Sequence, residues 1–489
     1  MRTGCADKLN SFLKGEKMET RQKRRTVVVS VLVLAGTFMF SLFAVGGNLE
    51  PSGPPGPTMK TLGEVEPRKA VQSLPGDANS LYVISQPGSY YLTGNIVGEP
   101  NKCGIALTAN NVTVDLMGFG LIGVPGSLDG FFVQYQETDE PLPIEEVSFN
   151  FSIRNGTICK WGGNGIDAYD MFLMIEGGVV KGKILVHSNS ELLNVSVNSN
   201  AEMGFSGRNC YTHMEDVSFC NNGGSGVNAY NAYLTIEGID AHKNDGHGLC
   251  VDGNSCCHME DVSFTYNGGD GMHILGMMTN VDAYSGYASH NGGNGMYVKV
   301  DGEASIHMED MSLTRNDANG LVADGNSCYH MMLDAYQVLA PHNGGGGIIV
   351  NGSGNLNQCT VVGNGGSGIE VGTGSTVRNC TARGNTGDGI VVSSNCHVVG
   401  NTCESNGVGV IGTTNPAGIR ATDGANRIEA NHVIGNNVGI DIDAGGNLII
   451  KNSSTGNTTN YDIASGNTAG PTLGTGDIVS DNPHANYEF

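Results

Sequence analysis

The chain has 489 residues, of which 75 are glycine and only 15% are charged, and its net charge at pH 7 is −23. So acidic a chain would repel nucleic acid, whose phosphates are bound by lysine and arginine. It would also repel anionic lipid surfaces and anionic polysaccharides unless cations intervene, although the charge is equally consistent with a role in solubility alone.

Residues 1–46 have the layout of an export signal. The basic residues Arg21–Arg25 precede the charge-free run Thr26–Val45, which is about long enough to span a membrane, and Ala44–Gly46 are small enough for cleavage. We expect either a cleaved signal peptide or an uncleaved signal anchor, and Met18 is an alternative start of the chain. Both alternatives predict an extracytoplasmic protein (secreted, periplasmic or on the cell surface) whose only membrane contact is this segment.

The next segments differ from one another in composition. Residues 47–61 are rich in proline and glycine and are expected to form an extended linker. Residues 62–130 contain short alternating runs that predict strands, but without the turn phrase of the later coils, as is typical of a cap at the end of a repeat array. Residues 131–147 are acidic and contain two prolines, so we expect a surface loop, for which ligand capture is a second interpretation.

A short phrase recurs in the following segment: asparagine, a glycine-containing turn, glycine, and then one apolar residue. This apolar residue returns every 21 to 27 positions, at Val227, Leu249, Met272, Met296, Leu321, Ile348, Ile369 and Ile390. A period in the twenties indicates a repeat architecture, and the short alternating runs favour strands over the helical half of a leucine-rich repeat. We therefore predict an all-β parallel β-helix solenoid of a dozen or more coils over residues 148–470, with these apolar residues in the core of one stacked sheet.

The asparagine of each phrase is expected to stack on its neighbours and to hydrogen-bond along the axis. The positions concerned are Asn222, Asn244, Asn267, Asn291, Asn316, Asn343, Asn364, Asn385 and Asn406. Cys359 and Cys380 are one coil apart and are predicted to fill the core, and the chain has no CxxC pair, which argues against disulfides and zinc ligation by cysteine. Residues 471–489 lose the period and are expected to close the end of the solenoid.

Two stretches carry a family resemblance. Residues 86–95 (QPGSYYLTGN) and 112–119 (VTVDLMGF) resemble the opening of exported bacterial right-handed parallel β-helix repeat proteins with the pectin-lyase-like superhelix, and residues 446–452 and 482–487 resemble their tails. The resemblance covers residues 58–489. It implies the fold and export, but little chemistry, because that superfamily includes lyases, hydrolases, epimerases, adhesins and phage proteins.

Catalytic residues cannot be assigned from the sequence. Gly246-His247-Gly248 is similar to the Gly-His-Gly of pectin-hydrolysing β-helix enzymes, but the paired upstream aspartates of those enzymes are missing. His247 occupies the position taken by Ser225 and Asp270 in sister coils, which favours a structural role. No two of the lysines and arginines on the repeats recur at one coil position, and a single one of them could still serve as the base of a lyase.

The phrase His-Met-Glu-Asp occurs three times, beginning at His213, His258 and His307, with two coils between copies. Strand alternation should point the methionine inward and the histidine and glutamate outward. Duplication of a two-coil unit explains these copies without any function, while a role for the outward histidines is the alternative.

One strip of the solenoid is predicted to carry a ladder of carboxylates about 5 Å apart. Its members are Glu215, Glu237, Glu260, Asp282, Glu309 and Asp334. Such acids could extend into water, share protons with raised pKa values, or bind divalent cations, of which calcium is the one expected.

These patterns together predict an exported, carbohydrate-associated binding or structural module whose partner is a polysaccharide or a cell-envelope glycan. The alternative is a polysaccharide lyase or glycoside hydrolase, which rests on the family resemblance alone. Calcium is the only cofactor that the sequence suggests.

Overall fold

The computed structural model describes residues 68–133, 150–168, 172–277, 279–325, 331–408, 415–476 and 480–489. The predicted export segment, the linker and most of the predicted acidic loop lie outside these residues, although Phe131–Val133 of that loop form a strand in the stack. In the described part the one helix is the single turn η1 (Val71–Ser73), and no helix there is long and apolar enough to cross a membrane.

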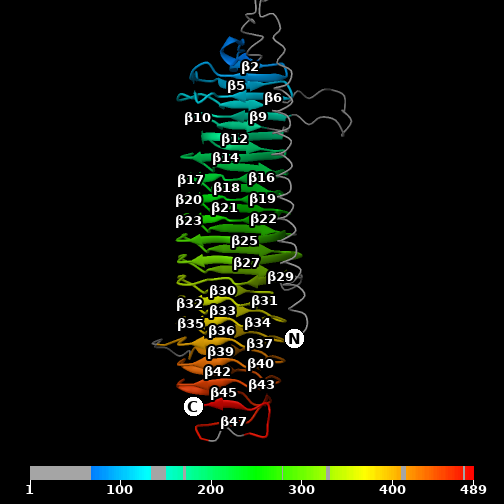
Figure 1. The fold of residues 1–489 in the computed structure, drawn as a ribbon, viewed down its shortest axis with the longest axis vertical. Coiled ribbons are helices and arrows are strands. Elements are labelled where there is room, and N and C mark those ends of the chain that lie inside the picture. Colours follow the sequence, from blue (N-terminus) through cyan, green and yellow to red (C-terminus); the bar gives the residue numbers. More distant parts are fainter. Residues whose placement is uncertain are drawn as a thin grey trace, which may run out of the picture. The chain divides into compact units, whose positions relative to one another are not determined.

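The described residues form a parallel β-helix whose coils stack along one axis (Figure 1). A typical coil has three faces, and consecutive coils pair in parallel on each of them. Face 1 consists of β2 (Ser80–Ile84), β5 (Cys103–Leu107), β8 (Phe131–Val133), β11 (Ile166–Ala168), β13 (Ile184–Val186), β15 (Phe205–Arg208), β18 (Val227–Tyr230), β21 (Leu249–Asp252), β24 (Met272–Gly276), β26 (Met296–Val300), β28 (Leu321–Gly325), β30 (Ile348–Val350), β33 (Ile369–Val371), β36 (Ile390–Val392), β39 (Ala417–Ala421), β42 (Val438–Ile442) and β45 (Thr459–Ile463).

Face 2 follows face 1 in each coil. It consists of β1 (Lys69–Ala70), β3 (Gly88–Tyr91), β6 (Val112–Asp115), β9 (Asn150–Arg154), β12 (Phe172–Lys181), β14 (Ser190–Asn198), β16 (Tyr211–Glu215), β19 (Tyr233–Glu237), β22 (Cys256–Glu260), β25 (Thr279–Ser289), β27 (Ala304–Thr314), β29 (Met331–Tyr336), β31 (Ser353–Asn357), β34 (Thr376–Arg378), β37 (His397–Val399), β40 (Arg427–Glu429), β43 (Leu448–Ile450) and β46 (Thr468–Ala469).

Face 3 completes the coil, and the long strands β12, β14, β25 and β27 continue from face 2 into it. Its own strands are β4 (Ile96–Val97), β7 (Gly120–Ile122), β10 (Thr157–Cys159), β17 (Ser218–Cys220), β20 (Asp240–His242), β23 (Ser263–Thr265), β32 (Thr360–Val362), β35 (Thr381–Arg383), β38 (Thr402–Glu404), β41 (His432–Ile434), β44 (Ser453–Thr455), β47 (Thr472–Leu473) and β48 (Asn486–Glu488).

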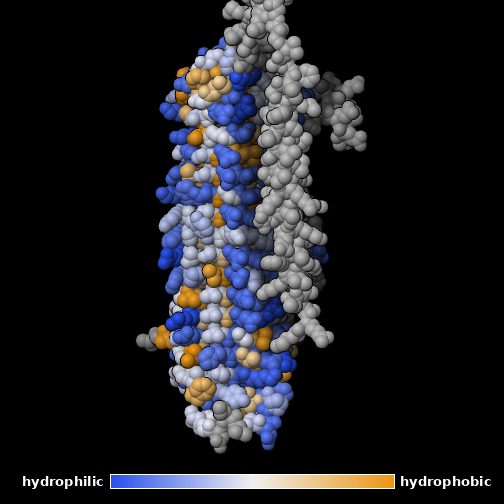
Figure 2. All heavy atoms as spheres, viewed as in Figure 1, coloured by the Kyte–Doolittle hydropathy of each residue, from blue (hydrophilic) through white to orange (hydrophobic). Residues whose placement is uncertain are grey.

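The predicted core register of face 1 is confirmed. The apolar residue of each turn phrase is the Cα partner of the same residue in the next coil, from Val227 through Ile369 to Ile390, and each of these side chains has no solvent exposure. Figure 2 shows that the outer surface in view is mostly polar, with apolar side chains in small groups. The fixed period therefore places one file of apolar side chains inside the solenoid, where burial stabilises every coil.

The predicted asparagine ladder is also confirmed. In one step, the Oδ1 of Asn291 accepts the backbone N–H and the Nδ2 of Asn267, and its Nδ2 donates to the carbonyl of Phe264 and to Asn316. The same pattern joins Asn222 to Asn406 and continues to Asn436 and Asn457. The side chains satisfy amides and carbonyls that would otherwise be buried without partners.

The C-terminal tail pairs with the last coils through its final strand, β48. β48 pairs with β44 and β47, and Asn486 accepts the N–H of Asn452, which extends a second ladder formed by Asn401, Asn431 and Asn452. Cys359 and Cys380 are buried free thiols, as expected for core fillers.

Candidate functional site

The outer surface of face 2 between β16 and β29 carries three parallel files of side chains, because every second residue of a strand points outward. We call them the groove file (Tyr211, Tyr233, Cys256, Asn280, Ser305 and Met332), the histidine file (His213, Thr235, His258, Asp282, His307 and Asp334) and the glutamate file (Glu215, Glu237, Glu260, Tyr284, Glu309 and Tyr336).

The predicted carboxylate ladder is wrong at two positions. Asp282 and Asp334 lie in the histidine file, and Tyr284 and Tyr336 take their expected places beside the glutamates. A shift of two residues keeps every side chain on the same face of a strand, so the alternation of apolar and polar residues in the sequence could not reveal it. Only Glu215, Glu237 and Glu260 are consecutive, and calcium binding by these three stays a prediction.

The three His-Met-Glu-Asp copies have the predicted orientation. Met214, Met259 and Met308 are buried, and the outward histidines are two coils apart. The ring of Tyr284 lies between His258 and His307, with centroid distances of 5.6 and 5.3 Å.

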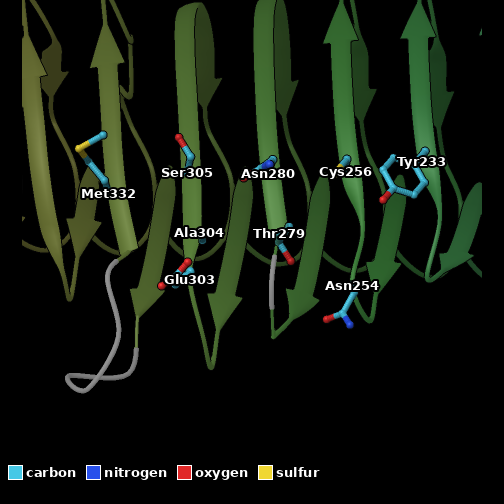
Figure 3. Close-up of a pocket in the computed structure, with 9 residues that line it drawn as sticks. All are labelled: Tyr233, Asn254, Cys256, Thr279, Asn280, Glu303, Ala304, Ser305 and Met332. Carbon is cyan, nitrogen blue, oxygen red and sulfur yellow. The ribbon is translucent and has the colours of Figure 1, made fainter.

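A groove runs along the solenoid axis beside the groove file (Figure 3). Its volume is about 660 Å³, and its lining includes Tyr233, Cys256, Asn280, Ser305 and Met332 from five consecutive coils. Five coils span about 19 Å at a strand spacing of about 4.8 Å. The rest of the lining comes from the first residues of β25 and β27, Thr279 and Ala304, and from the turn residues Asn254 and Glu303.

The groove is largely uncharged. Tyr233 at one end and Met332 at the other are 56% and 57% exposed, and between them lie the amide of Asn280 and the hydroxyl of Ser305. Among the described lining residues, Glu303 alone is charged. The surface therefore combines apolar side chains with neutral hydrogen-bonding groups, a combination typical of sites that orient a polar, uncharged ligand.

Face 1 carries the other histidine singled out in the sequence. The Nδ1 of His247 accepts the backbone N–H of Asp270 in the next coil at 2.9 Å. In the same way, the hydroxyl of Ser225 in the preceding coil accepts the backbone N–H of His247. His247 therefore has the structural role in the turn that the repeated phrase predicts for it. The sequence did not reveal that His273, three residues after Asp270, lies with its Nδ1 2.6 Å from the Asp270 carboxylate.

A second charged group on face 1 surrounds Arg420. Its Nε donates to Asp443 at 2.9 Å and is 3.9 Å from the carboxylate of Asp441. Burial, together with the negative charge of Asp443, raises the pKa of Asp441 to about 6.

We expect Asp441→Asn to stabilise the protein at pH 7.5 by about 1–2 kcal/mol, since one pKa unit corresponds to about 1.4 kcal/mol and solvent screens part of it. The folded protein holds the Asp441 proton more tightly than the unfolded chain does. The stability that the protonated Asp441 contributes is therefore complete below about pH 4 and is lost as the pH rises through about 6. Urea midpoints at pH 4.5 and 7.5 measure the gain, with Asp481→Asn at an exposed position as control. An equal gain at both pH values would contradict the assignment.

The family model described as a right handed beta helix region matches residues 182–333 and 341–482. The chain belongs to this family. The match confirms the expected right-handed parallel β-helix, and it covers the coils that carry the groove and the His247 cluster. No curated protein matches the sequence.

Several solved structures are similar to this β-helix. The A-module of the mannuronan C-5 epimerase AlgE4 from Azotobacter vinelandii is 14% identical, with 74% of this chain and 86% of that chain covered and a TM-score of 0.28. The Dettilon tailspike protein is 12% identical, with 74% and 60% covered and a TM-score of 0.26. The surface adhesin PfbA of Streptococcus pneumoniae is 8% identical, with 78% and 92% covered and a TM-score of 0.25. These scores are too low to support an inference about function.

Proposed function

We propose that this protein binds a polysaccharide chain along the groove on face 2. The observation that carries the proposal is the groove itself, which follows the coils for about 19 Å and offers one outward side chain per coil. A ligand that uses the whole groove must be long, extended and repetitive. A polysaccharide has these properties, whereas a small molecule would occupy only part of so open a surface.

The lining suits sugar rings. The apolar face of a pyranose can pack on the ring of Tyr233, while its hydroxyls can bond to Asn280 and Ser305. The acidic surface beside the groove disfavours anionic polymers unless cations bridge them.

We favour binding over cleavage of the polysaccharide. Most glycoside hydrolases use a pair of carboxyl groups on opposite sides of the scissile bond, and Glu303 is the sole carboxylate among the described lining residues. A lyase or hydrolase remains the alternative function. Export to the cell surface, which would bring the protein to such a ligand, stays a prediction.

We expect the full chain to bind one or more members of a panel of neutral, basic and acidic polysaccharides in affinity electrophoresis, and Tyr233→Ala to weaken the Kd about tenfold. Loss of a stacked aromatic side chain typically costs this much at a binding site. Calorimetry measures the Kd, and the same mixtures are assayed for unsaturated products and reducing ends, which would reveal a lyase or a hydrolase.

The control is Tyr287→Ala on face 3, because Tyr287 is 49% exposed and the substitution is the same. Binding that is weakened equally by both variants would place the ligand elsewhere. Failure of the native chain to bind any polysaccharide would contradict the proposed function.

A further inference from the structure

Three side chains that can bind a metal ion meet at the beginning of face 1, at a distinct place from the groove. His247 lies in the turn before β21, Asp270 lies in the turn before β24, and His273 is the second residue of β24. One donor atom of each lies within 4.8 Å of the other two. The Asp270 Oδ2 is 2.6 Å from the Nδ1 of His273 and 3.6 Å from the Nδ1 of His247.

The carboxylate at the centre is buried and fixed. Asp270 is 6% exposed, and its Oδ1 accepts the backbone N–H and the Nδ2 of Asn294 from the next coil. Its Oδ2 faces the Nδ1 atoms of the two imidazoles.

The two imidazoles are held in place by packing. Their rings stack with centroids 4.3 Å apart, and the ring of Tyr297 stacks on His273 from the other side at 5.1 Å. Because the Nδ1 of His247 accepts the backbone N–H of Asp270, this nitrogen carries no proton, and its lone pair is engaged by that N–H. Both histidine side chains are more than a fifth exposed, so an ion can enter from solvent.

We propose that His247, Asp270 and His273 bind one divalent transition-metal ion, with zinc as the reference ion. Two imidazole nitrogens and one carboxylate oxygen are ligands that zinc, nickel and copper prefer, whereas calcium prefers sites made of oxygen atoms only. Asn294 and Tyr297 supply the outer contacts that orient such ligands. Three protein ligands leave at least one coordination position for water or another small ligand.

Binding of the ion exchanges protons and hydrogen bonds in a defined way. Neutral His273 moves its proton from Nδ1 to Nε2 by exchange with solvent, so Nδ1 becomes available to the ion and no net proton is released. His247 already has its unprotonated nitrogen at the site, and the ion replaces the N–H of Asp270 as the partner of its lone pair.

The test uses the full chain without a polyhistidine tag, treated with chelator and then titrated with zinc in a calorimeter. We expect one zinc equivalent per chain with a micromolar or lower Kd, a higher Tm with zinc, and no calcium binding at this cluster. Cobalt should give the visible absorption bands of a four- or five-coordinate site. His273→Gln, an outward position of β24, should weaken the Kd for zinc at least tenfold. Its Tm is also measured without metal, because the substitution removes the hydrogen bond between His273 and Asp270.

His290→Gln is the matched control, since His290 is an exposed histidine in the turn after β25 that stacks on Tyr266. It should leave zinc binding unchanged. Asp270→Asn, which keeps the acceptor for Asn294, is a second variant that should lose the metal. Zinc affinity that is absent in the native chain, or that is equally strong in His273→Gln, would overturn the proposal, as would an equal loss in His290→Gln.

Discussion

Ile369→Asp is expected to unfold the coils around β33, at a cost of more than about 5 kcal/mol. The Ile369 side chain is completely buried between Ile348 and Ile390 of the adjacent coils. An aspartate there removes the buried apolar side chain and introduces a carboxyl group with no partner among these apolar neighbours. Because each coil of a solenoid contacts mainly its neighbours, the damage should begin locally.

Hydrogen exchange with peptide resolution, together with urea unfolding, measures this effect. We expect exchange to accelerate first in β30, β33 and β36. Val391→Asp is the control, because Val391 lies in β36, one coil away, but points outward and is half-buried beside Arg420. The control should change stability by less than about 1 kcal/mol. Unchanged exchange and melting in Ile369→Asp would contradict the register of face 1.

Asn291→Ala is expected to destabilise the protein by about 3–6 kcal/mol. The substitution leaves the backbone N–H and the Nδ2 of Asn267, and the carbonyl of Phe264, without a hydrogen bond that they make in the native ladder. Each buried polar group left unsatisfied costs about 1–3 kcal/mol. The loss should therefore exceed that of an ordinary polar-to-alanine change on the surface several-fold.

Urea unfolding followed by circular dichroism measures this loss, with Asn228→Ala as the control. Asn228 is a half-buried, outward-facing asparagine of β18 in a nearby coil, and its replacement should change stability by about 0.5 kcal/mol or less. Equal effects of the two substitutions would show that the ladder does not contribute to stability beyond an average asparagine.

The architecture follows from the repeat period alone. A period of 21 to 27 residues with one asparagine and one apolar residue at fixed places requires that each coil stack on the next, because one coil alone cannot bury its apolar side chains. The same phrase identified the core position of Ile369 and the ladder position of Asn291. These predictions hold because stacking in register repeats one local environment at every coil.

The identity of neighbouring outward side chains, in contrast, depends on the register in which the coils pair. The alternation of a strand is unchanged by a shift of two residues, so the sequence could not show that Tyr284, and not Asp282, lies beside Glu260. The repeat places His247 and Asp270 at equivalent positions, but the convergence of His273 on the same carboxylate depends on side-chain packing between coils. The groove likewise depends on the relative sizes of side chains contributed by five coils, which no single repeat encodes.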